Sequence, residues 1–460
     1  MRRQHGRYVV VGGSIAGLST ALALARAGVP VTLLERDDIP VAGDPEAAFA
    51  IERLGAPQAH QFHCFLARMV MVLRNRFPDV LADLEATGAW VEDGMGLGDG
   101  LGILYARRST IEWLLRRALE AEPAVEVRTG CRVAGVEGRA VAGARVPTVT
   151  GARLCDGSVV EGTVVACTGR RRDLPGWLRG LGVDVPERLV ESELIYITRW
   201  YALEPGSVRA SRMLGDLGYL FYLAAPGDGD TLAVAVAVHP SDRELRALLL
   251  DDEGFGRIAA LLPKVGRVMT ECGARPIRSS QPMAGLVNRL RRFLDGDGAP
   301  LVLGFHALGD AHTCTNPAYG RGCSLALVQA VALADAAVAH SDDPAARAIA
   351  YETACARQVE PWFHNSVLMD AMRRRVGTGS PPLPSGPDFL RLFRDLAAGR
   401  LEDSVLVRGF ARMVNLLVTP EELLADGDFL ARAAALAAAP PAGPSERVGP
   451  TREELLQAAA

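Results

Sequence analysis

The N-terminal residues follow two hydrophobic patterns in succession. Tyr8–Val11 is a short β-branched run, and a glycine cluster comes directly after it. Leu18, Leu22 and Ala25 then recur at helical spacing, Gly28 stands where a helix ends, and the run VTLLER predicts a second strand. The pattern predicts a β-α-β unit that begins almost at the first residue.

The segment RRSTIEWLLRRALE predicts a second amphipathic helix. Ser109 and Glu112 have the spacing of a capping box, in which each side chain bonds the other residue's backbone N–H. Short alternating strands are expected over residues 125–133 and 157–166. The apolar positions of the helix fall on one face: Ile111, Leu114, Leu115, Ala118 and Leu119.

Between about Leu189 and Thr270 the pattern becomes that of a sheet. LIYITRWYAL, GYLFYLAAP and TLAVAVAV are aromatic or β-branched runs separated by turns, which is typical of antiparallel strands. The run APLVLGFHALGDA returns to a buried strand, and the chain beyond Val331 is mostly helical. A loop is expected at GTGSPPLPSGP and a flexible tail at APPAGPSERVGP.

These patterns predict an α/β protein with three parts. Residues 1–185 and 275–341 are expected to form a discontinuous Rossmann-type domain. Residues 186–274 are expected to form an inserted antiparallel-sheet domain that binds substrate, and residues 342–460 a helical C-terminal region.

Composition removes several function classes. The chain has 460 residues, of which 49% are hydrophobic and 23% charged, and its net charge of −4 argues against nucleic acid as a partner. No uncharged apolar stretch has spanning length, and the N-terminus enters a strand without a signal-like segment, so a cytoplasmic protein without a membrane span is expected. Eight cysteines without a C-x-x-C pair predict free thiols, and no ligand pattern predicts a metal site.

The stretch VVVGGSIAGLSTALALARAGVPVTLLERD has the features of a dinucleotide-binding fingerprint. Gly12 makes the tight turn, and Gly17 lets the helix pack closely on the strands. The helix N-terminus offers free N–H groups to a pyrophosphate, and Glu35 can accept both hydroxyls of an adenosine ribose. Ser14 replaces the usual middle glycine, and its hydroxyl can itself reach a phosphate. This stretch alone leaves NAD and FAD open.

A second glycine-rich stretch, GDAHTCTNPAYGRGC, favours FAD. Asp310 can accept hydrogen bonds from ribitol hydroxyls, which NAD lacks, or brace the pyrophosphate through the adjacent amides. Pro317 through Gly322 then bring a helix N-terminus to the flavin edge, where its amides would stabilise negative charge on reduced flavin. The Rossmann-type domain is therefore expected to be an FAD-binding domain of the glutathione-reductase-like type.

These motifs also carry a resemblance. GGSIAGL, LLERD, the arginine before STIEWLL, ACTGRRRDLPGWLRGLGV and GDAHTCTNPAYGRGC occur in the order found in FAD-dependent monooxygenases similar to p-hydroxybenzoate hydroxylase. The resemblance covers roughly residues 7–365, and GAPQAHQFH, FPDVLADLEATGA, YITRW and EPW look like the bacterial polyether-epoxidase branch. Two departures are CTGRRRDLPGW, where many relatives have an Asp-Gly motif, and Gln61, where that branch has a histidine. The first disfavours aromatic-ring hydroxylation.

The resemblance implies a reaction as well as a fold. NAD(P)H, or a partner flavin reductase, reduces FAD; O2 adds at C4a; and the hydroperoxyflavin hydroxylates or epoxidises a lipophilic small molecule of secondary metabolism. An FAD-dependent reductase or dehydrogenase of the prenyl-reductase type remains an alternative, as does a flavin-binding protein without catalysis. The sheet aromatics are expected mainly to pack within the sheet, although they can line a substrate site: Tyr196, Trp200, Tyr201, Tyr219, Phe221 and Tyr222.

The resemblance also assigns residues. Arg108 is expected at the flavin diphosphate, Thr168 and Gly169 beside the adenosine half, and Gln58 and His63 near the isoalloxazine as candidate catalytic residues. The predicted cofactor-binding set is Gly12, Gly13, Ser14, Ala16, Gly17, Glu35, Arg36, Arg108, Thr168, Gly169, Gly309, Asp310, Pro317, Gly320, Arg321 and Gly322.

Overall fold

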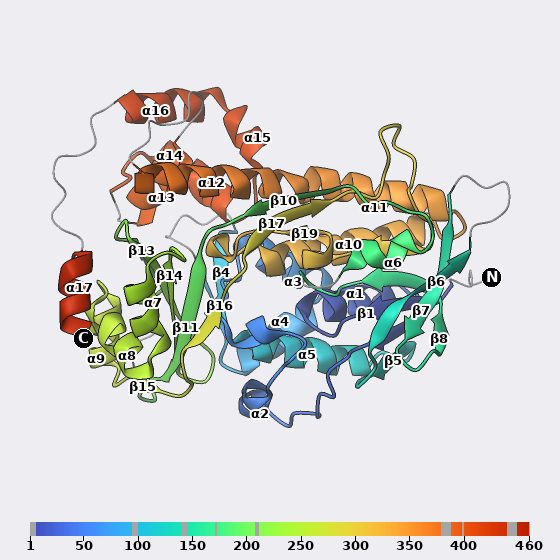
Figure 1. Cartoon of the computed structure of the whole chain (residues 1–460), viewed down its shortest axis with the longest axis horizontal. Helices are drawn as coiled ribbons and strands as arrows, with labels where there is room; N and C mark the ends of the chain where they lie inside the picture. Colours follow the sequence, from blue (N-terminus) through green and yellow to red (C-terminus); the bar gives the residue numbers. More distant parts are fainter. Residues whose placement is uncertain are drawn as a thin grey trace.

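A five-stranded parallel sheet organises the first unit, with four strands from the N-terminal part of the chain and one, β18, from residues 305–307. Figure 1 shows β1 and β5 of this sheet beside α1 and α5. The computed structural model describes residues 6–93, 100–139, 146–170, 173–207, 211–378, 388–397, 400–438 and 449–459. The strands lie in the order β18-β9-β1-β2-β5, so the predicted β-α-β unit is present as β1-α1-β2. Their bounds are β1 Tyr8–Val11, β2 Val31–Leu34, β5 Val125–Arg128, β9 Thr163–Ala166 and β18 Phe305–Ala307.

The two faces of this sheet are covered differently because successive side chains of a strand point to opposite faces. Tyr8 and Val10 pack with the helices, whereas Val9 and Val11 pack towards a small antiparallel sheet, β6-β7-β8, and α6. The helical side consists of α1 Ile15–Arg26, α3 Ala67–Arg76, α4 Pro78–Ala86, α5 Arg108–Glu120, α10 Gly322–Ala339 and α11 Pro344–Gln358. The other side consists of β6 Val133–Arg139, β7 Thr148–Leu154, β8 Val159–Glu161 and α6 Leu174–Arg179.

The long helix α10 is the most apolar of the described helices that have membrane-spanning length. It has 18 residues, but Asp335 interrupts its apolar run and 67% of it is buried within the protein. It packs against α1, α3 and α11 in the main core. These contacts are those of a core helix.

A six-stranded antiparallel sheet forms the second unit, as the alternating pattern predicts. Its path is β12-β13-β14-β11-β15, and β16 also pairs with β11. The sheet extends past the expected end at residue 274, because β15 and β16 belong to it. The bounds are β11 Ile195–Ala202, β12 Met213–Asp216, β13 Leu220–Gly227, β14 Thr231–Val238, β15 Arg275–Pro276 and β16 Gln281–Met283, with α7 Arg243–Leu250, α8 Asp252–Leu261 and α9 Val265–Glu271 on one face.

A separate three-stranded sheet, β10-β17-β19, joins the two units. The predicted 186–274 domain included β10 in the six-stranded sheet, but β10 pairs with β17 in this separate sheet. Two shorter strands, β3 and β4, pair beside α3. The bounds are β3 Trp90–Asp93, β4 Gly102–Tyr105, β10 Glu187–Glu191, β17 Val287–Arg291 and β19 Thr313–Cys314. The three-part domain division stays a prediction.

The C-terminal region is helical and covers the second face of the antiparallel sheet (Figure 1). α17 packs separately, on α7 and α8. Most of the expected flexible tail at 439–450 and most of the loop at 377–387 lie outside the described residues. The helices are α12 Glu360–Thr378, α13 Phe389–Ala397, α14 Ser404–Val414, α15 Pro420–Leu424, α16 Gly427–Ala438 and α17 Arg452–Ala459.

Candidate functional site

One cavity of about 510 Å³ gathers the predicted site residues from distant parts of the chain. Its volume lies in the range of small-molecule sites. Of the predicted residues only Gly17 does not line it. The others do: Gly12, Gly13, Ser14, Ala16, Glu35, Arg36, Gln58, His63, Arg108, Thr168, Gly169, Gly309, Asp310, Pro317, Gly320, Arg321 and Gly322.

The first glycine turn is shaped by close backbone contacts. Gly12 has φ +114°, and a Cβ there would lie 2.4 Å from the Cys167 carbonyl oxygen. A Cβ on Gly17 would lie 1.7 Å from the Gly12 carbonyl oxygen, so any side chain would separate α1 from the turn. Gly17 thus acts through packing, as the sequence predicts, and only indirectly on the cavity.

Glu35 lies directly after β2 and is 4% exposed. One carboxylate oxygen accepts from the Gly13 amide at 2.6 Å, and the other from the Asp37 amide at 2.9 Å. Arg53 lies 3.3 Å from the first oxygen. A carboxylate has about four acceptor sites, so Glu35 keeps capacity for ribose hydroxyls while it holds the loop.

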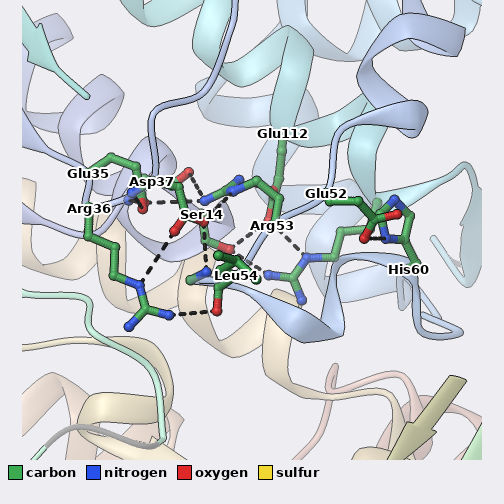
Figure 2. Close-up of polar contacts among 12 residues, drawn as sticks. Ser14, Glu35, Arg36, Asp37, Glu52, Arg53, Leu54, His60 and Glu112 are labelled. Carbon is green, nitrogen blue, oxygen red and sulfur yellow. Dashed lines mark hydrogen bonds and ion pairs between the residues drawn. The ribbon is translucent and has the colours of Figure 1, made fainter. Parts of the chain in front are cut away.

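Arg53 and Glu112 form an ion network that sequence reasoning missed (Figure 2). Arg53 bridges Asp37, at 3.1 Å, and Glu112, at 3.2 Å. Glu112 accepts from the Ser14 hydroxyl at 2.6 Å and from the Ile15 amide at 3.2 Å, at the start of α1. Arg108 donates to Glu112 at 2.9 Å.

The predicted capping box is therefore wrong. The described helix α5 begins at Arg108 after an N-cap at Arg107 without a side-chain cap bond, and Glu112 turns to Arg53, Arg108 and α1 instead. Burial alone would raise the pKa of Glu112, but Arg108 and Arg53 outweigh it and lower that pKa from 4.5 to about 2. The carboxylate is ionised across the physiological range.

Arg108 also contacts two predicted residues. It donates to the Ser14 oxygen at 2.5 Å and to His63 Nε2 at 2.8 Å. Because Nε2 accepts from Arg108, His63 carries its proton on Nδ1 and donates to the Gln61 carbonyl oxygen at 2.8 Å. Burial and the Arg108 charge lower the pKa of His63 from 6.5 to about 3. Because His63 is neutral and accepts from Arg108, its position suits a role in orienting the Arg108 side chain better than a role as a proton donor.

Asp310 lies in a 3-10 turn, Gly309–Ala311, that α10 holds in place. The Gly309 amide donates to the Gln329 side-chain oxygen at 2.9 Å, and Gly309 has φ +63°. Burial raises the pKa of Asp310, and the charges of Arg170, Arg108 and Arg289 oppose that shift. Gln329 also helps to hold the Asp310 turn, and sequence reasoning missed it. A single polar residue in an apolar helix gives no sign of its role until its hydrogen-bond partner is known.

The next turn carries Pro317–Tyr319 to the start of α10 at Gly322. Asp370 on α12 fixes it by accepting from the Asn316 amide group at 2.8 Å and from the Tyr319 hydroxyl at 2.7 Å. Gly320 is left-handed, with φ +66°, and a Cβ there would lie 2.9 Å from Cys64 Cβ.

The residues of the cavity fit an FAD molecule. The Thr168 hydroxyl, one of the lining groups, is buried and has no partner among the described residues, so it is free to bond a ligand. Six arginines line the cavity: Arg36, Arg53, Arg108, Arg132, Arg170 and Arg321. The first three pair with Asp37, Glu35 and Glu112, whereas the last three form no ion pair with an acid of the described residues. That excess of positive charge suits a pyrophosphate. The described residues contain no cluster of potential metal ligands.

A second, smaller cavity of about 40 Å³ adjoins the first. Five residues line both: Phe62, Cys64, Pro317, Gly320 and Arg321. The remaining lining is mostly apolar. Leu214 and Leu223 come from the antiparallel sheet, and Met369, Met413 and Val414 come from the C-terminal helices. The other lining residues are Leu66, Arg212, Ala318 and Tyr319.

The sheet aromatics divide between the two faces, because alternate residues of a strand point in opposite directions. Tyr196 and Phe221 pack with the C-terminal helices, and Trp200 donates to the His60 carbonyl oxygen at 2.7 Å. Tyr201 and Tyr222 pack on the other side with α7–α9. Tyr219 donates to the Pro450 carbonyl oxygen at 2.9 Å. Packing is thus their main role, as expected, and none of the six lines either cavity.

Comparison with known proteins agrees with this geometry. Residues 7–95 match the family described as FAD dependent oxidoreductase. Over these residues the chain has the sequence pattern of an FAD-dependent oxidoreductase. The chain is also 27% identical over 360 residues to Protein Rv3254 of Mycobacterium tuberculosis, which covers 70% of this chain and 71% of the relative.

Two solved structures share the fold. p-Nitrophenol 4-monooxygenase PnpA from Pseudomonas putida DLL-E4 has a TM-score of 0.59 at 17% identity, covering 90% of this chain and 98% of PnpA. The flavin-dependent brominase Bmp2 has a TM-score of 0.61 at 15% identity, covering 94% of this chain and 98% of Bmp2. Because one fold carries both chemistries, the fold alone does not fix the reaction.

Proposed function

We propose that the chain is an FAD-dependent monooxygenase that hydroxylates or epoxidises a lipophilic small molecule. The observation that carries the proposal is the adjoining cavity, which meets the larger one at Pro317, Gly320 and Arg321. A flavin held along the first cavity would meet a substrate at this junction, and at about 40 Å³ the second cavity would admit only part of that substrate. PnpA, named as a monooxygenase, has the same fold. The resemblance to polyether epoxidases supports the same reaction class.

The chain's own residues would bind and orient the cofactor. Glu35 would accept the adenosine ribose hydroxyls, while the unused N–H groups of Arg108 and the Ala16 amide at the start of α1 would hold the pyrophosphate. Asp310 would accept from the ribitol, and the N-terminus of α10 would face the flavin edge. The bound FAD would supply the chemistry, which is reduction by NAD(P)H or a partner reductase and activation of O2.

Exclusion of water is the second contribution of the protein. Leu66, Leu214, Leu223, Met369 and Met413 give the smaller cavity an apolar lining. A dry pocket keeps activated oxygen from being lost to solvent before it reaches substrate.

Rapid-mixing spectroscopy tests the proposal. The flavin of the purified protein is reduced without air, oxygen is admitted, and the absorbance is followed with and without candidate ligands. A transient species distinct from oxidised and reduced flavin would support an oxygenase. Slow reoxidation in a single phase under every condition would instead favour the reductase alternative.

A further inference from the structure

The smaller cavity contains two arginines, although the rest of its lining is mostly apolar. Arg321 lines both cavities and is 3% exposed. Arg212 lines only the smaller one, next to Cys64. The two guanidinium groups therefore lie where a substrate beside the flavin would be held.

Neither arginine forms an ion pair with an acid of the described residues, although the charges of Asp370 and Glu92 act on Arg321 and Arg212 respectively. Arg321 donates to the Trp362 carbonyl oxygen at 3.1 Å and to the Asn365 side-chain oxygen at 2.5 Å, and its buried Nε has no partner. The Arg212 guanidinium donates to Cys64 Sγ at 3.1 Å. A guanidinium has five N–H donors, so most donors of both groups are left over.

The nearby acids are already engaged by other groups. Asp370 accepts from Tyr319, Asn316 and Asn288. Glu92 accepts from the Tyr105 hydroxyl at 2.7 Å and from the Ser211 hydroxyl at 2.7 Å. Burial of Arg321 lowers its pKa to about 10, so the group still carries its charge at neutral pH.

A buried cation without an ion-pair partner is costly, and this applies to Arg321, whereas Arg212 is only half-buried. The planar fork of a guanidinium matches the geometry of a carboxylate better than that of a neutral amide. The surrounding leucine and methionine side chains offer contact to an apolar body. The pocket therefore combines a cationic end with an apolar wall.

We propose that the substrate carries a carboxylate, which binds to Arg212 and Arg321 while its apolar body lies against Leu214, Leu223 and Met369. This inference rests on the proposed function in naming the ligand a substrate. Binding of the anion itself requires neither oxygen nor reduction, so it is measurable separately.

The test uses the FAD-loaded protein and two probes of equal shape, 1-naphthoate and the neutral 1-naphthamide. Each is titrated at pH 8 while the flavin absorbance spectrum is recorded, and dissociation constants are compared. We expect the anion to bind about tenfold or more tightly than the amide, because hydrogen bonds to charged groups are the stronger ones.

The variants R212M and R321M should each weaken naphthoate binding about tenfold and leave naphthamide binding within about twofold. R321K keeps the charge, and it should retain part of the preference for the anion even if R321M holds FAD poorly. R267M is the control, because Arg267 lies on α9 and its side chain is 73% exposed. It should change neither affinity.

Equal affinities for the two probes, no binding of the anion, or unchanged naphthoate binding in R212M and R321M would overturn the inference. These outcomes leave the monooxygenase proposal standing if the transient flavin species is observed. If the transient flavin species is not observed, but naphthoate still binds and its binding still depends on the two arginines, only the proposed function is overturned.

Discussion

Substitution of Glu112 by glutamine should destabilise the protein far more than a surface change would. The pKa of Glu112 falls from 4.5 to about 2, and this shift is equivalent to about 3 kcal/mol of stability in the ionised state. E112Q also leaves Arg53 and Arg108 buried with one acceptor fewer, and breaking buried ion pairs costs about 3–5 kcal/mol. The free energy of unfolding should therefore fall by about 3 kcal/mol at pH 7.

The pH dependence has a defined sign. A carboxylate whose folded-state pKa is depressed stabilises the fold fully above its unfolded pKa, and the contribution fades as pH falls from about 4.5 towards about 2. The difference between wild type and E112Q should thus be constant above about pH 5.5 and shrink below pH 4.5. Urea unfolding of the FAD-free proteins, followed by tryptophan fluorescence across this range, measures it.

E120Q is the matched control, since Glu120 lies on the same helix and pairs with Arg116 at 2.6 Å near the surface. That pair should contribute less than about 1 kcal/mol. An E112Q effect no larger than that of E120Q, or one that does not change between pH 6 and pH 3, would refute the interpretation of Glu112 as the ionised centre of the network.

Three further substitutions probe the cavity. D310A should strongly reduce FAD retention because it removes a charge-assisted acceptor; full flavin loading of the purified variant would contradict this. H63L should weaken FAD binding about tenfold because it leaves an Arg108 donor unpaired, whereas H63Q keeps an acceptor and should bind FAD nearly as wild type does. The dissociation constants are measured by flavin fluorescence, and equal values for the two variants would argue against an orienting role of His63. G320A should cost at least about 1–2 kcal/mol because of the left-handed backbone, and melting temperatures should show this against G296A, whose added methyl meets nothing within 4 Å.

Local patterns predicted the parts of the site that the backbone itself builds. Gly12 and Glu35 follow from a strand, a tight turn and a helix, and these are encoded within about thirty residues. Asp310 could be found in the same way, because its turn lies between a buried strand and an apolar helix. In each case the neighbouring sequence already contains the packing partner.

The rest depends on contacts between distant segments. Arg53 lies in an irregular stretch, and only the fold brings it between Asp37 and Glu112. Glu112 satisfied the local spacing of a capping box, but two buried guanidinium groups are stronger partners than a backbone amide. The expected domain end at residue 274 differs from the end of the sheet for a related reason, since β15 and β16 are too short to show an alternating pattern.

The order of the chain also affects how the site assembles during synthesis. The cavity needs Gly12 and Arg108 from early segments and Asp310 and Gly322 from a late one, and the whole antiparallel sheet is translated between them. At about 5–20 residues per second, roughly 10–40 s separate Arg108 from Gly322 as they leave the ribosome. During that interval β1 and β2 can pair, but β9 still lacks its neighbour β18, and the glycine turn of α1 lacks the helix that completes the site. Cofactor capture is therefore a late event, and the nascent N-terminal unit passes through a stage in which apolar surface meant for α10 faces solvent.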